Sequence, residues 1–226
     1  MKQIDETQPT QQPSKPVSVA PMASRWAAVL GLIAFGVLYA ALPDRVTIGP
    51  NWLILPFEVL FFIPILVSSI TKRALRQEIT HTLIIIALAV ITLALIGGII
   101  LFVVTLPGKG TGEAKSLLRT AILLWVSNVL VFGLWYWEVD GGGPYKRHEH
   151  GHQAADFLFP QQANGNDGSW APHFIDYLFV GFTDATAFSP TDTYPLTRRA
   201  KALMMIEASN AAIITVIIVG RVVNIL

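Results

Sequence analysis

The fold is decided by the stretch ITHTLIIIALAVITLALIGGIILFVVTL, which occupies residues 79–106. Its 28 residues include one histidine near the start and no Asp, Glu, Lys or Arg. At about 1.5 Å per residue, a helix of this length exceeds the roughly 30 Å hydrocarbon core of a bilayer. The stretch therefore predicts a helix that crosses a membrane.

The composition of the whole chain agrees with a membrane protein. Of its 226 residues, 53% are hydrophobic and 14% are charged, whereas about a quarter of the residues of a soluble domain carry a charge. The 16 basic and 15 acidic side chains nearly cancel, so no overall positive field favours nucleic acid as a partner. The chain has no cysteine, which excludes disulfides, thiolate metal sites and cysteine nucleophiles.

Further stretches have the length and the apolar character of membrane spans. They are residues 26–42, 51–70, 118–137 and 198–226. The stretch 51–70 carries Glu58 and two prolines, which predicts a kinked helix. The stretch 118–137 ends in Trp135-Tyr136-Trp137, the aromatic belt expected where a helix meets the headgroups. Together with residues 79–106, these stretches predict about five transmembrane helices.

The remaining segments complete the predicted organisation. Residues 1–25 are rich in Gln and Pro and predict a disordered tail ahead of a four-helix membrane region, residues 26–137. Residues 138–172 are polar and glycine-rich, and they predict a loop in water. Residues 173–188, HFIDYLFVGFTDATAF, are too short and polar to cross a bilayer and too apolar for an exposed loop, so residues 173–226 are expected to hold a re-entrant half-helix and the final span. The predicted fold class is an all-α polytopic membrane helix bundle.

The distribution of Lys and Arg predicts the orientation. With the N-terminus in the cytoplasm, the predicted inside segments carry eleven basic residues and the outside segments four. The positive-inside rule favours this orientation and puts the loop 138–172 in the cytoplasm. A channel-like arrangement would instead put that loop outside, so the two expectations conflict.

A turn rich in hydroxyl and carboxyl groups follows the predicted half-helix. It contains Thr183, Asp184, Thr186, Ser189, Thr191, Asp192 and Thr193. One hypothesis is that these groups line a hydrated path for ions. The alternative is that they cap helices, because residues 189–192, Ser-Pro-Thr-Asp, fit a capping box with Pro at the first helical position.

The order of parts in the C-terminal third resembles the pore module of tetrameric cation channels, in which an outer helix, a pore helix, a filter loop and an inner helix follow one another. Residues 183–197, TDATAFSPTDTYPLT, are similar to the filter region in their threonines and in the Asp, Pro and Thr that follow. The resemblance implies a homotetramer that passes a monovalent cation. A potassium filter uses the carbonyls of a glycine-rich strand, and residues 187–190 contain no glycine, so potassium selectivity of that kind is not expected.

Residues 130–226 also resemble a widespread family of uncharacterised bacterial inner-membrane proteins that carries only a domain-of-unknown-function label. The resemblance rests on Phe159-Pro160, on Asp-Tyr-Leu-Phe from Asp176, on Phe182-Thr183, on Thr-Asp-Thr from Thr191 and on Val-Asn-Ile-Leu from Val223. It implies a multi-pass protein of the bacterial inner membrane and no known activity.

Polar residues of the last predicted span share one face. Glu207, Asn210, Arg221 and Asn224 fall on an arc about 100° wide. Because a charge in hydrocarbon costs several kcal/mol, this face is expected to look into the bundle or a wet cavity. Glu58 is the candidate partner of Arg221, or else the binder of a proton or cation. The alternative is a buried ion pair that only fixes helix packing.

The histidines of the polar loop, His148, His150 and His152, are weak candidates for a transition-metal site, because imidazole suits Zn²⁺, Cu²⁺ and Ni²⁺. A solvated polar loop is the favoured explanation of these histidines, so neither a metal nor a cofactor is predicted. The sequence has no nucleophile elbow, P-loop, dinucleotide fingerprint or HExxH pattern. We therefore do not expect an enzyme.

These observations favour a pore- or permeation-type protein in a lipid bilayer, in which residues 183–193 and the polar face of the last span line a path for a monovalent cation. A homo-oligomer is expected, a tetramer if the channel analogy is literal. One competing class is a non-conducting accessory or assembly protein, in which the same groups lock helices together. The other is a small secondary carrier that couples transport to Glu58 or Glu207.

Overall fold

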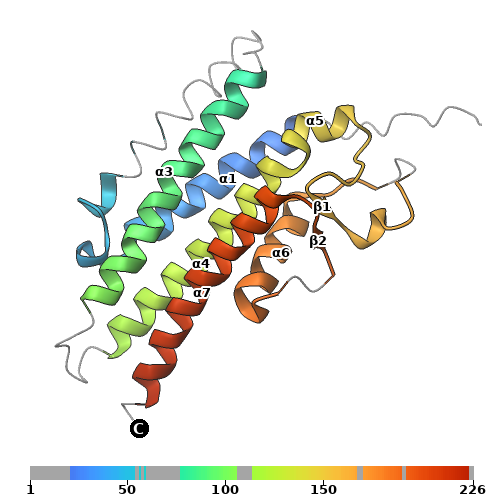
Figure 1. Cartoon of the computed structure of the whole chain (residues 1–226). Coiled ribbons are helices and arrows are strands. Elements are labelled where there is room, and N and C mark those ends of the chain that lie inside the picture. Colours follow the sequence, from blue (N-terminus) through green and yellow to red (C-terminus); the bar gives the residue numbers. More distant parts are fainter. Residues whose placement is uncertain are drawn as a thin grey trace, which may run out of the picture.

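The computed structural model describes residues 21–53, 56, 59, 77–105, 114–166, 170–189 and 192–223. Its long helices are α1 (Pro21–Ala40), α3 (Gln77–Val104), α4 (Ala114–Val139) and α7 (Arg198–Val223) (Figure 1). Its shorter elements are η1 (Asp44–Val46), η2 (Asn51–Leu53), η4 (Asp140–Gly142), α5 (Pro144–Glu149), β1 (Phe157–Leu158), η5 (Pro160–Gln162), α6 (Phe174–Ala187) and β2 (Tyr194–Pro195). The described residues are mostly helical, which confirms the coarse prediction of a helical protein.

Helices able to cross a bilayer match the predicted spans in part. By length and composition, the segments Glu78–Val104, Lys115–Gly142 and Arg198–Gly220 qualify among the described residues. The first predicted span is represented by a shorter apolar helix, Leu30–Ala40. Most of the second, with Glu58, lies outside the described residues. Three helices that could cross a membrane thus indicate a membrane protein, and the total of five stays a prediction.

The start of α1 differs from its predicted position. The helix begins at Pro21, inside the segment predicted to be a disordered tail that ends at residue 25. Proline favours the first turn of a helix, where its missing N–H breaks no bond. The predicted boundary at residue 25 rested on the charge of Arg25, but the helix includes this residue.

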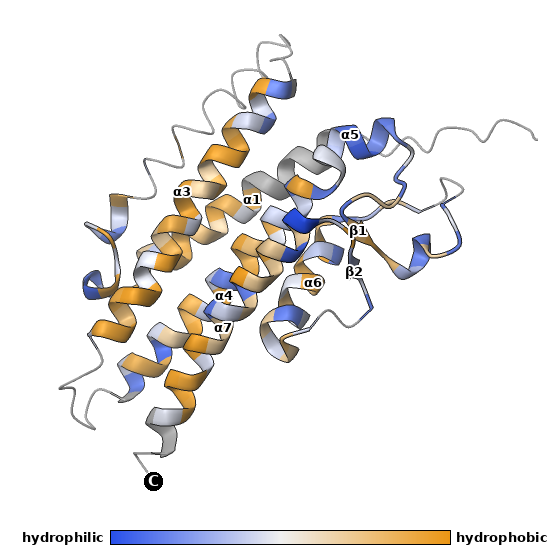
Figure 2. Ribbon diagram, in the orientation of Figure 1, coloured by the Kyte–Doolittle hydropathy of each residue, from blue (hydrophilic) through white to orange (hydrophobic). Residues whose placement is uncertain are grey.

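The surface of α3 shows why this bundle suits a bilayer. Its inward side chains, such as Leu88 and Ile91, are fully buried, whereas Leu93 and Ile100 on its outer side are 67% and 56% exposed. Figure 2 shows α3 as predominantly hydrophobic beyond its hydrophilic start. A helix that is apolar on all sides is typical of a protein interior or a membrane span.

The helix α4 lies at the centre and contacts α1, α3, α6 and α7. Small residues allow close approaches between backbones. A Cβ at Gly133 would lie 3.2 Å from the Leu178 Cα of α6. Because position 133 is glycine, α6 can lie directly against the central helix.

The predicted half-helix forms a hairpin whose two ends lie at the same end of the bundle. Near the start of α6, the Tyr177 hydroxyl donates a hydrogen bond of 2.5 Å to Asp140, just beyond α4. The helix ends at Phe188, which adopts a left-handed conformation with φ 54°. The chain then returns, β2 pairs with β1, and the Leu196 N–H donates to the Asp156 carbonyl at 2.8 Å. This path is visible in Figure 1.

The predicted loop 138–172 is a folded unit rather than a solvated loop. We call residues 140–166 together with β2 the cap. Its side chains Arg147, Asp156 and Phe157 are 3%, 0% and 0% exposed, although Figure 2 shows the region as largely hydrophilic. The polar side chains fold inwards because they satisfy one another and the backbone, a possibility that average composition does not reveal.

Candidate functional site

A polar cluster lies between α4, α6 and α7, inside the bundle. Its centre is Glu207 of α7, which is 0% exposed. The Tyr136 hydroxyl of α4 donates a short hydrogen bond to Glu207 Oε2. The other carboxyl oxygen, Oε1, is buried and has no hydrogen-bond partner among the described residues.

Two asparagines join α4 to α7 beside this carboxyl group. Asn128 donates from Nδ2 to the Glu207 carbonyl at 3.1 Å, and its Oδ1 accepts a bond of 3.1 Å from Asn210 Nδ2. Both side chains are buried. These bonds fix the position of Glu207 relative to α4.

A second acid, Asp184, reaches the cluster from α6. It is 2% exposed, and its Oδ2 also has no hydrogen-bond partner within the described part of the chain. Its carboxyl group is close enough to Glu207 and to the Tyr136 hydroxyl to interact with both electrostatically. We call Asp184 and Glu207 the acid pair.

The approach of α6 to Glu207 depends on Gly181, one turn before Asp184. A Cβ at this position would lie 3.1 Å from Glu207 Oε1 and 3.1 Å from the Val129 carbonyl oxygen. Both distances are shorter than ordinary van der Waals contacts. A glycine here therefore lets the backbone of α6 approach the carboxyl group.

The chemistry of the acid pair follows from its surroundings. Two carboxylates that interact away from water repel, and each loses its hydration. Among the described residues, no lysine or arginine forms an ion pair with either acid. A proton or a cation on the pair would remove the repulsion and occupy the unpartnered oxygens.

The structure brings together some of the predicted path residues and not others. Asp184, Glu207 and Asn210 belong to the polar cluster. The hydroxyls of Thr183 and Thr186 instead donate to carbonyls of their own helix, at 3.0 and 2.6 Å. Each hydroxyl hydrogen is therefore bonded within α6, and neither hydroxyl donates to the polar cluster.

The rest of the predicted turn lies beyond the end of α6. Ser189 and Asp192 are exposed, whereas Thr193 is buried and donates to Asp192 Oδ1 at 3.2 Å. Thr191 and Glu58 lie outside the described residues, as does the side chain of Arg221. The predicted pairing of Glu58 with Arg221 therefore stays a prediction.

Sequence reasoning missed the role of Tyr136. The run Trp135-Tyr136-Trp137 was expected to form an aromatic belt at the headgroups, but Tyr136 is 0% exposed and Trp137 5%. Trp135 donates from Nε1 to the Thr92 hydroxyl at 2.7 Å. Tyr136 and Trp137 therefore do not face outwards as belt residues would, because α4 is the central helix and other elements cover this end of it.

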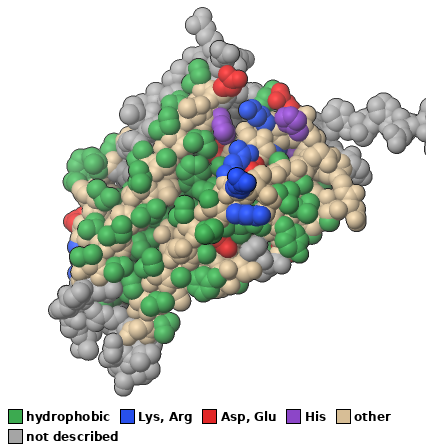
Figure 3. Space-filling view, viewed as in Figure 1, with side chains coloured by type: hydrophobic (Ala, Val, Ile, Leu, Met, Phe, Trp, Pro, Cys, Tyr) green, Lys and Arg blue, Asp and Glu red, His purple; other side chains and the backbone are tan. Residues whose placement is uncertain are grey.

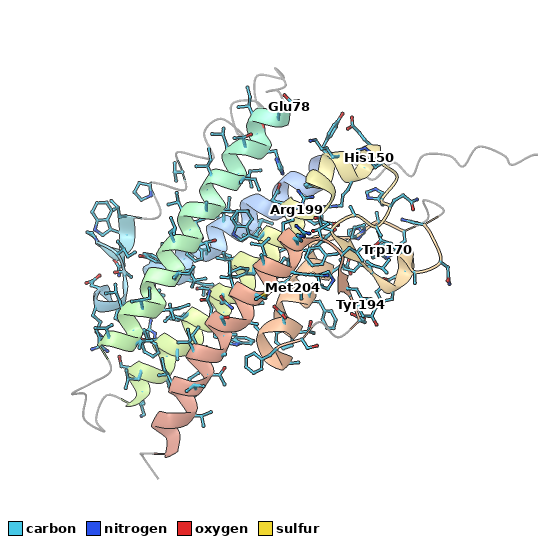
Figure 4. The ribbon with its side chains drawn as sticks, in the orientation of Figure 1. Glu78, His150, Trp170, Tyr194, Arg199 and Met204 are labelled. Atoms are coloured by element: carbon cyan, nitrogen blue, oxygen red, sulfur yellow. The ribbon has the colours of Figure 1, made fainter. Side chains whose placement is uncertain are left out.

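A second polar network ties the cap to the start of α7. Asp156 accepts hydrogen bonds from the Gly141 N–H at 2.9 Å and from the Thr197 hydroxyl at 2.6 Å. Arg199 binds both of its carboxylate oxygens. Burial opposes ionisation of Asp156, but these bonds outweigh burial and hold the pKa of Asp156 below its usual range. Figure 4 shows Arg199 where α7 meets the cap.

The predicted histidine group is divided. His148 Nδ1 and His152 Nε2 are 3.2 Å apart, whereas His150 is exposed and pairs through Nδ1 with the Lys146 carbonyl at 2.6 Å. Within the described ranges, no three His, Cys, Asp or Glu side chains gather in a way that could hold a metal ion.

The fold and this cluster define a helical membrane protein with two acids enclosed between a central helix, a terminal helix and a half-length helix. Comparison with protein-family models, with curated proteins and with solved structures found no match.

Proposed function

We propose that the chain is an integral membrane protein that moves a proton or a monovalent cation, and that the acid pair is its binding point. The observation that carries the proposal is the burial of Asp184 and Glu207 with one unpartnered oxygen each. Ionisable groups inside a membrane are costly and typically mark ion paths or proton relays.

The depth of the two acids supports this proposal. Glu207 lies nine residues after the start of α7, roughly 14 Å along the helix, and Asp184 lies ten residues into α6, roughly 15 Å. Half of a 30 Å hydrocarbon core is about the same distance. If the cap lies at the membrane surface, both acids reach the middle of the bilayer, where many transporters bind their ions at interrupted helices.

The basic residues support a cytoplasmic cap. Arg198 and Lys201 are exposed at the start of α7, and Figure 3 shows Lys and Arg side chains gathered in this part of a surface that is otherwise rich in hydrophobic groups. The positive-inside rule then puts the cap in the cytoplasm. In this arrangement α6 enters the bilayer from the cytoplasm and the chain returns to the same side. We propose the inner membrane of a bacterium as the location.

The enclosure of the acid pair favours a carrier over an open pore. Glu207 is 0% and Asp184 2% exposed, so an ion reaches them only after the helices move. A carrier of this kind works by exposing one site alternately to the two sides. The half-length helix is the feature that supports the second candidate, a pore formed by several copies around the hairpin.

The test is ion flux into liposomes that contain the purified full-length protein. A pH-sensitive dye and imposed gradients of H⁺, Na⁺ or K⁺ identify the ion. We expect Glu207→Gln and Asp184→Asn to abolish flux, and Glu149→Gln, which changes an exposed acid of the cap, to leave it unchanged. Elution volume and melting temperature in detergent show whether each variant is folded.

Two results would refute the proposal. One is unchanged flux in both acid-pair variants, which makes the pair structural. The other is an absence of flux under every gradient for folded wild-type protein, which favours the non-conducting accessory class. The number of copies in the flux-competent particle separates the carrier from the oligomeric pore.

A further inference from the structure

A second group of buried polar atoms, which lack hydrogen-bond partners among the described residues, lies where the end of α4 meets the cap, and all of them are nitrogens. They are Trp137 Nε1, Arg147 Nη2 and His152 Nδ1. Buried donors in folded proteins are nearly always bonded to protein, to water or to a ligand. The acid pair leaves oxygens without partners, whereas this group leaves nitrogens, so the two sites suit ligands of opposite charge.

Arg147 is the charged member of the group and is 3% exposed. Its Nη1 donates to the carbonyls of Trp137 at 2.6 Å and Asp140 at 2.7 Å. Its guanidinium carbon lies 4.7 Å from the centre of the Trp137 ring and 5.0 Å from that of Tyr177. One nitrogen of the guanidinium is therefore fixed by carbonyls and the planar group is stacked, which leaves Nη2 with unused donors.

His152 lies next to Arg147 in space. Its N–H donates to the Arg147 carbonyl at 2.9 Å, and its φ of 55° turns the chain at this point. Burial, and then the neighbouring His148, Arg147 and His173, hold the pKa of His152 below its usual value. Of these neighbours Arg147 carries a permanent positive charge, and each histidine adds to it when protonated, so an anion beside them would be stabilised.

The neighbouring carboxylate of Asp140 does not accept a hydrogen bond from Arg147 Nη2. The Asp140 carboxylate is 4.0 Å from Arg147 Nε, but its Oδ1 accepts from the N–H groups of Asp156 and Phe157. Its Oδ2 accepts from the Tyr177 hydroxyl. Asp140 therefore reduces the local positive charge without serving as the acceptor for Nη2.

We propose that this group binds a phosphate-type oxyanion, with Arg147 Nη2, Trp137 Nε1 and His152 Nδ1 as its donors. Tetrahedral oxyanions offer several acceptor atoms and pair well with guanidinium donors. Trp137 lies near the end of the span Lys115–Gly142, which puts it close to the lipid headgroups if the cap lies at the membrane surface. The anion is thus either the phosphate of an anionic lipid or free inorganic phosphate. The inference is independent of the transport proposal.

Binding is measured on the full-length protein in a phosphate-free detergent. Isothermal titration with inorganic phosphate tests the free anion. Nanodiscs of phosphatidylglycerol, compared with phosphatidylcholine, test an anionic headgroup through ³¹P spectra and melting temperature. In the arm that binds, the His152 pKa measured by NMR rises, because the anion stabilises the protonated ring.

Three variants make the test specific. Trp137→Phe keeps an aromatic ring for stacking and removes Nε1–H together with the second ring of the indole, and His152→Asn keeps a residue that tolerates positive φ. We expect each to weaken binding about tenfold, the loss of roughly one hydrogen bond to a charged group. His150→Ala removes an exposed imidazole outside the group and should bind like wild type.

The two arms and the control decide the proposal. Titration with inorganic phosphate identifies a free anion, and a response only to phosphatidylglycerol identifies a headgroup. No response in either arm means that buried water alone satisfies these nitrogens, and the proposal fails. It also fails if His150→Ala weakens binding as much as Trp137→Phe, because the effect is then not specific to the donor group.

Discussion

Replacing Asp156 by asparagine tests whether one carboxylate ties the cap to α7. Asp156 is 0% exposed and accepts bonds from the Gly141 N–H, the Thr197 hydroxyl and two nitrogens of Arg199. An asparagine offers one carbonyl oxygen, and its amide nitrogen is itself a donor. At least one donor around position 156 must then lose its acceptor.

The magnitude follows from what is left unpaired. The part-buried N–H of Gly141 costs up to about 1–3 kcal/mol without an acceptor. The Arg199 side chain is 58% exposed, so water solvates its released guanidinium and the ion pair adds at most about 1 kcal/mol. We expect Asp156→Asn to lower the free energy of unfolding of the cap by about 1–4 kcal/mol.

The assay combines melting in detergent micelles with amide hydrogen exchange. Asp156→Asn should lower the melting temperature and speed exchange at Gly141 and in β1. Arg199→Ala, which leaves the carboxylate and its backbone donor in place, should have the smaller effect. An unchanged exchange rate at Gly141, or an equal loss in Arg199→Ala, would refute the reasoning that the donors other than Arg199 dominate.

The same carboxylate gives a pH dependence of known sign. Because its folded pKa lies below its usual value, the stabilisation by Asp156 is complete above the unfolded pKa, about 3.9. It is lost as the pH falls through the folded pKa. The difference in melting temperature between wild type and Asp156→Asn should therefore be constant near neutral pH and shrink below about pH 4.

The remaining predictions concern the polar cluster. Gly181→Val should cost about 1–3 kcal/mol by overpacking and reduce ion flux, whereas Gly220→Ala, where a Cβ meets no atom within 4 Å, should be neutral in melting and flux assays. Asn128→Ala removes two bonds between α4 and α7 and should cost about 1–2 kcal/mol in the same melts. Tyr136→Phe leaves Glu207 Oε2 without its donor and should reduce flux with a loss of only about 1 kcal/mol in stability; a normal rate would exclude the hydroxyl from the ion site.

Local properties of the sequence predict the helices well. The apolar runs 79–106 and 118–137 correspond to α3 and α4. Length and hydrophobicity are local properties of the sequence, and they are the two properties that the hydrocarbon core of a bilayer requires of a span. The half-length of α6 was equally visible, since residues 173–188 lack the apolar length of a span. These features require no knowledge of which helices touch.

The contacts of the site require that knowledge. Glu207 was identified as a polar residue of the last span, but its partner Tyr136 was assigned to an aromatic belt. Their pairing depends on the register of α4 against α7, which is set by the asparagine bonds and by the cap. The inward folding of Asp156 was hidden for the same reason, because its donors come from residue 141 and from residues 197 and 199.

The network around Asp156 also constrains how the acid pair can open. Both ends of the hairpin are held at the cap, by Tyr177 on Asp140 and by Leu196 on the Asp156 carbonyl. Further along α6, no side chain separates the backbone at position 181 from Glu207, because that residue is glycine. If the acid pair separates without loss of the cap bonds, we expect α6 to tilt about its fixed upper end, which moves Asp184 further than Tyr177. A cross-link that joins the lower end of α6 to α7 should accordingly stop flux while the cap network and its hydrogen-exchange protection stay intact.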